Sequence, residues 1–239
     1  MTLSDVIVGC ILLAGLLFSI GKKKLTVPAA ATGALLGWII YAGGGLTGLA
    51  MMTVFFILGT AATSWKKDRK MDIRSNAGHQ NTRTTAQVLA NAGVAGLAGL
   101  LGLLSKSHGP LLRIAMAGCF ASATADTLSS ELGMAYGRRF FNIMTGRPDR
   151  KGLDGVVSIE GLLIGAGGAA LIATIFMIGE GRNGITFLVI TFSGVFGNWV
   201  DSVLGALFER KGQLSNDMVN LLNTLAGALL AVLLETMWV

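Results

Sequence analysis

Residues 125–133 read Ala-Asp-Thr-Leu-Ser-Ser-Glu-Leu-Gly and end an apolar run that begins near residue 110. A membrane-spanning helix needs roughly 20 mostly apolar residues, and this run provides that length. A carboxylate at membrane depth costs about 2.5–3.5 kcal/mol on insertion scales, so it normally marks an ion, proton or substrate site. Asp126 and Glu131 therefore predict a polar site within a transmembrane fold.

The composition places the whole chain in the membrane. Of its 239 residues, 52% are hydrophobic and 13% are charged, whereas a soluble domain carries about 25% charged residues. The 34 glycines suit helices that approach one another closely in lipid. The formal net charge of +6 is read loop by loop in a membrane protein, so it does not predict nucleic-acid binding. We expect an all-α, polytopic transmembrane helix bundle.

The apolar runs predict about eight spans in one integral-membrane domain, residues 1–239. A three-helix part, 1–64, precedes a motif-bearing part, 81–239, and Gly43, Gly44 and Gly45 predict a tight turn between the second and third spans. The predicted spans cover about 3–20, 26–42, 45–64, 85–104, 110–132, 156–178, 184–208 and 217–237.

The charges of the connecting loops alternate along the chain. Odd-numbered loops are basic and even-numbered loops carry few charges, so the odd loops are predicted to be cytoplasmic and both termini to lie outside. The acids near the span ends then fall on the cytoplasmic side, where nucleotides are found. The basic residues of the odd loops are Lys22, Lys23 and Lys24 in the first, Lys66, Lys67, Arg69, Lys70, Arg74 and Arg83 in the third, Arg138, Arg139, Arg147, Arg150 and Lys151 in the fifth, and Arg210 and Lys211 in the seventh.

The spacing of the two opening acids makes a specific prediction. Five residues correspond to about 140° around a helix of 3.6 residues per turn, so the two side chains do not share a face. If both serve one site, the helix breaks between Thr127 and Ser130, or one acid acts indirectly. A regular helix leaves Asp126 as the stronger candidate. The alternative is a pair of polar residues that bond neighbouring helices.

Further polar residues interrupt the later spans. Asp201 lies in the seventh run beside Asn198 and Ser202, where a helix–helix contact is the alternative role. Asp217 and Asn220 open the last span. A helix cap from Ser215 or Asn216, with Asp217 favourable in the first turn, explains part of that motif.

Two segments indicate anion binding. Arg83, Gln87 and Asn91 recur every four residues, which places them on one helix face; Arg83 suits a phosphate or an ordinary membrane anchor. The glycine- and base-rich residues 146–161 precede the sixth span and contain Glu160. A glycine-rich backbone before a helix N-terminus is suited to bind an anion. The loop lacks the P-loop spacing. Its basic residues also suit an alternative role that only sets the orientation of the spans in the membrane.

These motifs together resemble a known family. Asp126, Gly133, Gly137 and Arg138, followed by Ser158-Ile-Glu-Gly, are similar to the pattern of dolichol and phytol kinases, and more distantly to CTP-dependent lipid transferases. A closer resemblance is to the integral-membrane family that contains the plant chloroplast phytyl-phosphate kinase and its bacterial and archaeal relatives. The sequence departs from that family at Ala92, Leu153 and Val156. Its five signatures occur in order at 87–91, 125–133, 155–158, 201–206 and 216–220.

The resemblance implies transfer of a phosphoryl group from CTP or ATP to a lipid-embedded polyprenyl or phytyl monophosphate. Such transfer depends on Mg²⁺ and on cations that steady the phosphates. The implied metal-holding residues are Asp126, Glu131 and Asp201, with Arg83 and Arg138 also catalytic. The implied substrate- and phosphate-binding residues are Asn91, Arg139, Lys151, Gly155, Ser158, Glu160, Asn198, Ser202, Asp217 and Asn220.

Two other functions stay open on the sequence. A CTP-dependent nucleotidyltransferase that acts on a lipid phosphate shares this style of motif and releases pyrophosphate. An ion-coupled transporter also uses intramembrane carboxylates, but the clustering of the acids at one membrane face disfavours a midplane transport site. The prenyl chain length, the nucleotide and the oligomeric state, including a homodimer, are not determined.

Overall fold

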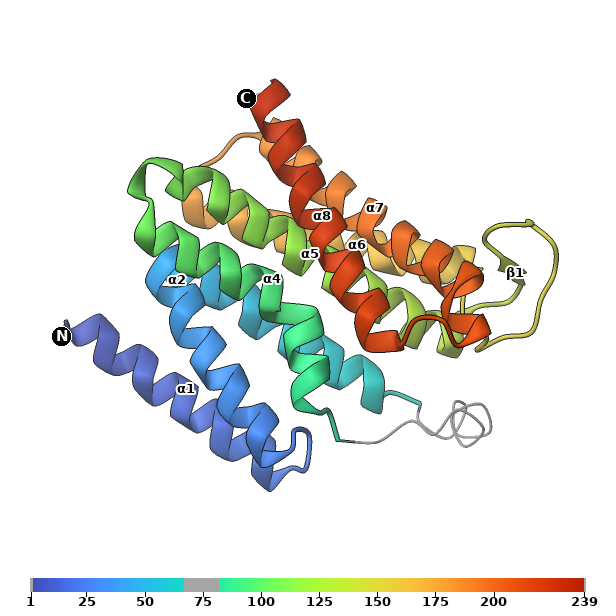
Figure 1. Cartoon of the computed structure of the whole chain (residues 1–239), viewed down its shortest axis with the longest axis horizontal. Coiled ribbons are helices and arrows are strands. Elements are labelled where there is room, and N and C mark those ends of the chain that lie inside the picture. The colour runs from blue at the N-terminus through green and yellow to red at the C-terminus, as the bar shows by residue number, and fades with distance from the viewer. Residues whose placement is uncertain (1, 67–81, 239) are drawn as a thin grey trace.

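The structure is a computed structural model that describes residues 2–66 and 82–238 (Figure 1). It is a bundle of long helices, so the predicted all-α class is confirmed. The helices are α1 (Leu3–Gly21), α2 (Val27–Ser64), α4 (Thr85–Leu104), α5 (Gly109–Tyr136), α6 (Ile159–Glu180), α7 (Gly184–Leu207) and α8 (Asn216–Trp238). The short elements are the 3₁₀ turns η2 (Lys106–His108) and η3 (Glu209–Lys211) and the antiparallel strands β1 (Phe140–Asn142) and β2 (Val156–Ser158).

Six of the described helices are long and apolar enough to cross a membrane: α1, α2, α4, α6, α7 and α8. The protein is therefore a multi-pass membrane protein. The count of eight spans stays a prediction. Residues 67–81 of the third basic loop lie outside the described residues.

Helix α2 consists of two halves that fold back on each other at Gly45. This residue has φ 65° and ψ −164°, a backbone conformation that is essentially limited to glycine. A Cβ placed on Gly37 would lie 3.7 Å from Cε of Met52, although these residues would be about 22 Å apart along a straight helix. The two halves match the predicted runs 26–42 and 45–64, and the reversal is the predicted tight turn.

Helix α5 occupies the centre of the bundle and contacts α2, α4, α6, α7 and α8. Small residues permit this, because a Cβ on Gly118 would collide with the backbone of Gly227 on α8, and one on Gly194 of α7 would lie 2.8 Å from Cβ of Ala121. Close approach through small residues is how membrane helices gain packing energy. Polar residues of α5 are thereby held inside protein.

The structure excludes one of the alternatives for the two opening acids and differs from one predicted boundary. Helix α5 runs without interruption from Gly109 to Tyr136, so the break considered between Thr127 and Ser130 does not occur. The sixth span was expected to begin at 156, but Val156–Ser158 pairs with Phe140–Asn142 as a strand. Helix α6 begins only after Ser158, whose hydroxyl accepts a hydrogen bond from the Gly161 amide at 3.1 Å.

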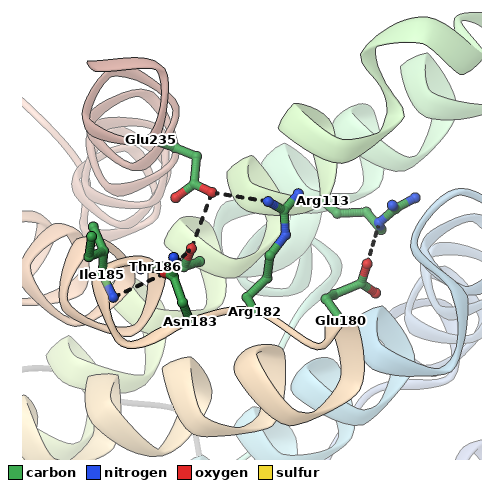
Figure 2. A network of polar contacts seen from close by, with 7 residues as sticks. All are labelled: Arg113, Glu180, Arg182, Asn183, Ile185, Thr186 and Glu235. Carbon is green, nitrogen blue, oxygen red and sulfur yellow. Dashed lines mark hydrogen bonds and ion pairs between the residues drawn. The ribbon is translucent and has the colours of Figure 1, made fainter. Parts of the chain in front are cut away.

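The two ends of the bundle differ in character. The α1–α2 loop lies at the bottom of Figure 1 and the α7–α8 loop and the β1–β2 segment lie at the right, whereas the start of α1 lies at the left and the end of α8 at the top. Figure 2 shows ion pairs at the other end, with Arg113 2.8 Å from Glu180 and Arg182 3.7 Å from the buried Glu235. Thr186 also donates to Glu235 at 3.2 Å. Glu180 and Glu235 therefore already face arginines.

Candidate functional site

A polar cavity of about 690 Å³ opens among the helix ends on the side of the odd-numbered loops. Its wall is built by the α1–α2 loop, the end of α2, the start of α4, the last turns of α5, the β2 segment, α7 and the start of α8. Segments that are far apart in the sequence therefore meet in one space. Basic side chains form one part of the wall and acidic side chains form another.

The basic part depends on a short contact between two chain segments. Leu25 and Arg83 form a parallel β-bridge, in which the Arg83 amide donates to the Lys24 carbonyl at 2.9 Å and the Thr26 amide donates to the Arg83 carbonyl at 3.1 Å. Lys22, Lys23 and Lys24 are thus placed on the same cavity as Arg83. Ammonium and guanidinium groups so arranged suit a phosphate.

Arg83 is held at the inner side of this basic part. A Cβ on Gly59 would lie 3.0 Å from the Arg83 guanidinium and 3.5 Å from Thr127, which shows how closely the side chain packs between α2 and α5. Burial lowers the pKa of the Arg83 guanidinium, and the nearby Glu131 carboxylate opposes this shift. Arginine stays protonated in proteins, so Arg83 is a permanent positive charge beside the cavity.

The acidic part centres on two aspartates from different helices. The carboxyl groups of Asp126 on α5 and Asp201 on α7 lie within hydrogen-bonding reach of each other. Asn223 of α8 donates to Asp201 at 2.6 Å and accepts from Ser122 of α5 at 3.0 Å. The pair is braced by three helices, and no lysine or arginine of the described part of the chain forms an ion pair with it.

Glu131 belongs to the basic part instead. It is 9% exposed, accepts a hydrogen bond from Thr63 of α2 at 3.1 Å and interacts with Arg83. The regular course of α5 thus directs its two acids to different neighbours, as the 140° offset predicted. Within the described residues, no three acidic, histidine or cysteine side chains gather into a metal-holding group. Asp126 and Asp201, from two different helices, are a pair of carboxyl groups that could hold a metal.

The segment before α6 contacts α7 through glycines. Gly155 has φ 72°, and a Cβ there would lie 2.5 Å from the backbone nitrogen of Ala206. A Cβ on Gly205 would likewise lie 2.9 Å from the Gly155 nitrogen. This contact places Asp154 and Gly155 on the cavity wall, near Glu209 and Ser158.

Comparison with known proteins gives the family. The model of the family described as integral membrane protein DUF92 matches residues 10–228. The chain belongs to this family. The family resemblance that the five motifs indicated is therefore confirmed.

Relatives in this DUF92 family come from archaea, bacteria and plants. An uncharacterized membrane protein of Methanocaldococcus jannaschii is 35% identical over 204 residues, which cover 84% of this chain and 81% of that protein. An uncharacterized membrane protein of Synechocystis is 34% identical over 244 residues, covering 98% and 91%. Protein VTE6, chloroplastic, of Arabidopsis thaliana is 28% identical over 235 residues, covering 92% and 69%. No solved structure matches the chain.

The cavity brings together most of the residues that the DUF92 motifs single out. Asp217 opens α8 outside the lining, where the Ser215 hydroxyl caps the helix by accepting from the Met218 amide at 3.3 Å. The predicted residues that line the cavity are Arg83, Asn91, Asp126, Glu131, Gly155, Ser158, Asn198, Asp201, Ser202 and Asn220.

Four other predicted residues also lie outside the lining: Arg138, Arg139 and Lys151 in the segment between α5 and α6, and Glu160 in the first turn of α6. The Arg138 amide donates to Glu160 at 3.4 Å, and Lys151 lies 5.9 Å from the centre of the Phe140 ring. Arg138 and Arg139 are exposed. This segment therefore contributes backbone and Asp154 to the cavity rather than its cations.

Sequence reasoning missed the three lysines. Lys22, Lys23 and Lys24 were assigned only to membrane orientation, because nothing in their local sequence shows that they meet Arg83. Three consecutive lysines at the end of a span are the available signal, and it also suits an ordinary cytoplasmic loop. Asp154 and Glu209 were missed in the same way.

Proposed function

We propose that this protein is a prenyl-phosphate kinase. It transfers a phosphoryl group from CTP or ATP to a polyprenyl or phytyl monophosphate at the cytoplasmic membrane face and depends on Mg²⁺. The observation that carries the proposal is the meeting of a carboxyl pair, Asp126 and Asp201, with the basic group of Arg83 and Lys22–Lys24 in one cavity. The relationship to VTE6 and the motif resemblance support the same reaction class.

The residues present fit a magnesium ion. Mg²⁺ is usually bound by one or two carboxylates, and phosphate oxygens and water complete its coordination. Asp126 and Asp201 provide two carboxyl groups without an ion-pairing cation among the described residues. When bound there, the ion would neutralise charge on the nucleotide phosphates.

The chain's own residues then position the two substrates. In the reaction, an oxygen of the acceptor phosphate forms a bond to the γ-phosphorus of the nucleotide. The bond from that phosphorus to the β–γ bridging oxygen breaks, which releases the nucleoside diphosphate. The acceptor oxygen is already anionic, so no general base is required. Arg83 and the three lysines balance the acceptor's charge, and such positioning and electrostatics supply most of the catalysis in phosphoryl transfer.

The membrane side follows from the charges of the loops. The basic first, fifth and seventh loops lie at the end of the bundle that contains the cavity. Positively charged loops favour the cytoplasmic side. We therefore assign the cavity to the side where nucleoside triphosphates are available.

The decisive experiment follows the label of the nucleotide. Purified protein with Mg²⁺, CTP or ATP and phytyl or geranylgeranyl phosphate should transfer γ-label to the lipid and leave α-label on free nucleoside diphosphate. A nucleotidyltransferase would instead place α-label on the lipid and release pyrophosphate. Absence of turnover with every nucleotide and prenyl phosphate would refute the proposal.

A matched pair of variants locates the reaction in the cavity. Asp126→Asn removes one carboxylate of the pair and should abolish transfer. Asp5→Asn makes the same chemical change at the other end of the bundle, where Asp5 accepts a hydrogen bond from Tyr41 at 3.1 Å, and should leave transfer unchanged. Equal activity of the two variants would contradict this placement.

A further inference from the structure

An apolar pocket of about 160 Å³ lies beside the polar cavity. It is enclosed by α1, both halves of α2 and α4, and its lining includes Leu12, Leu16, Gly33, Met52 and Phe56. None of these helices except the start of α4 carries one of the five family signatures. Apart from residues of the 87–91 signature on α4, the pocket is lined by residues outside the five signatures, and the phosphate chemistry does not account for it.

The two spaces share three residues. Arg83, Gln87 and Asn91 line both the apolar pocket and the polar cavity. The Asn91 side-chain nitrogen donates to the Gln87 carbonyl at 2.9 Å, while its buried side-chain oxygen has no hydrogen-bonding partner within residues 2–66 and 82–238. A buried polar atom without a partner usually meets a ligand or water. The region where the two spaces meet therefore borders the polar cavity on one side and the apolar pocket on the other.

This arrangement suits an amphiphile with a phosphate head. A phosphate at Arg83 and Lys22–Lys24 has its charge balanced, and a hydrocarbon attached to it enters the apolar pocket directly. A pocket of about 160 Å³ is close to the ~150 Å³ of an engineered cavity that binds benzene. It holds roughly one isoprene unit. Ile11, which lines the pocket, is 49% exposed on the outer surface of α1, so a longer tail can continue toward lipid.

We propose that this pocket binds the phosphate-proximal isoprene unit of the acceptor, with the phosphate at Arg83 and Lys22–Lys24. The inference rests on the proposed kinase function and deepens it by dividing the substrates between two sides. The prenyl phosphate lies against α1, α2 and α4, and the nucleotide lies against the carboxyl pair on α5 and α7. The first isoprene unit is recognised by protein, whereas units further along the tail are tolerated because they reach the bilayer.

Filling the pocket tests the inference. A Cβ placed on Gly33 meets no atom within 4 Å, so Gly33→Leu extends into open space without striking the backbone. Replacing a glycine inside a helix also favours the helix. We expect the KM for geranylgeranyl phosphate to rise at least about tenfold, with the KM for the nucleotide unchanged. The matched control is Gly167→Leu on α6, where a Cβ also meets no atom within 4 Å and which lines neither space.

A second measurement does not require turnover or a folded variant. Wild-type protein is irradiated with a prenyl phosphate that carries a diazirine on its first isoprene unit, and the labelled peptides are mapped. Label should appear on α1, α2 or the start of α4, and excess geranylgeranyl phosphate should compete with it. Label confined to α6, α7 or α8 overturns the inference.

The two proposals fail in different ways. If wild-type protein phosphorylates prenyl phosphates but Gly33→Leu behaves like Gly167→Leu, the tail site is wrong and the kinase function stands. If wild-type protein shows no turnover but the label maps to the apolar pocket and is competed, prenyl phosphate binds there and the proposed reaction is wrong.

Discussion

Replacing Asn223 with alanine should weaken the dependence of the proposed phosphoryl transfer on Mg²⁺. Asn223 is fully buried and donates a 2.6 Å hydrogen bond to Asp201. Its own side-chain oxygen accepts from Ser122 at 3.0 Å, so the amide is fixed in orientation. Asn223→Ala removes the brace of one member of the carboxyl pair but leaves both carboxylates in place.

The structure sets the expected size of this effect. A hydrogen bond to a charged group contributes roughly 1.5–3 kcal/mol. Loss of a residue that orients a metal-binding side chain typically lowers metal affinity about 10- to 100-fold. The Mg²⁺ concentration for half-maximal phosphoryl transfer should therefore rise within that range. Ser122→Ala should have a smaller effect, because the bond from Asn223 to Asp201 remains.

The assay is a Mg²⁺ titration of label transfer to geranylgeranyl phosphate, with thermal unfolding measured on the same preparations. Asn183→Ala provides the control. Asn183 caps α7 at the other end of the bundle by accepting from the Ile185 and Thr186 amides, each at 3.1 Å, so its loss should cost about 1 kcal/mol of stability without moving the Mg²⁺ midpoint. If Asn223→Ala and Asn183→Ala show the same midpoint as wild type, the braced carboxyl pair is not the metal site.

Two further predictions concern Arg83 in the basic part of the cavity and Asp149 in the loop between β1 and β2. Arg83→Gln should raise the KM for the prenyl phosphate roughly tenfold or more in steady-state kinetics. Arg182→Gln, which loses the ion pair to Glu235, should leave that KM unchanged. Equal KM values for the two variants would exclude Arg83 from the acceptor site. Hydrogen bonds from the Arg150 amide and then from Arg210 hold the pKa of Asp149 below its ordinary value. Because the folded pKa is the lower one, this stabilisation is present above the ordinary pKa and is lost as pH falls through the lowered value. Arg210→Gln should reduce that loss when thermal unfolding is followed from about pH 7 to about pH 3, and an identical pH dependence would contradict the assignment.

Local sequence signals anticipated the features that depend on single segments. The reversal at Gly45 follows from three consecutive glycines between apolar runs. The separation of Asp126 from Glu131 follows from helical geometry alone. The joint location of Arg83, Asp126 and Asp201 at one end of the bundle followed from their positions near the ends of predicted spans.

Features that depend on contacts between distant segments could not be anticipated. The bridge between Leu25 and Arg83 joins residues far apart in the chain, and neither segment has a strand pattern. Val156–Ser158 was assigned to a span because a short apolar run does not distinguish a strand from the start of a helix. The apolar pocket arises where α1, α2 and α4 leave space between them. The hydrophobic periodicity of a sequence does not indicate such an unfilled space between helices.

The brace from Asn223 has a consequence for the order in which the protein is made. The lysines and Arg83 precede Asp126 and Asp201 in the chain, and all of these residues precede Asn223. Asn223 is contributed by the last helix, α8. A nascent chain that has inserted the helices before α8 can therefore bring Lys22–Lys24 and Arg83 together. It cannot yet hold Asp126 and Asp201 in a fixed arrangement, because Asn223 is missing. Competence for the proposed reaction is therefore expected only after α8 has been synthesised and packs against α5 and α7.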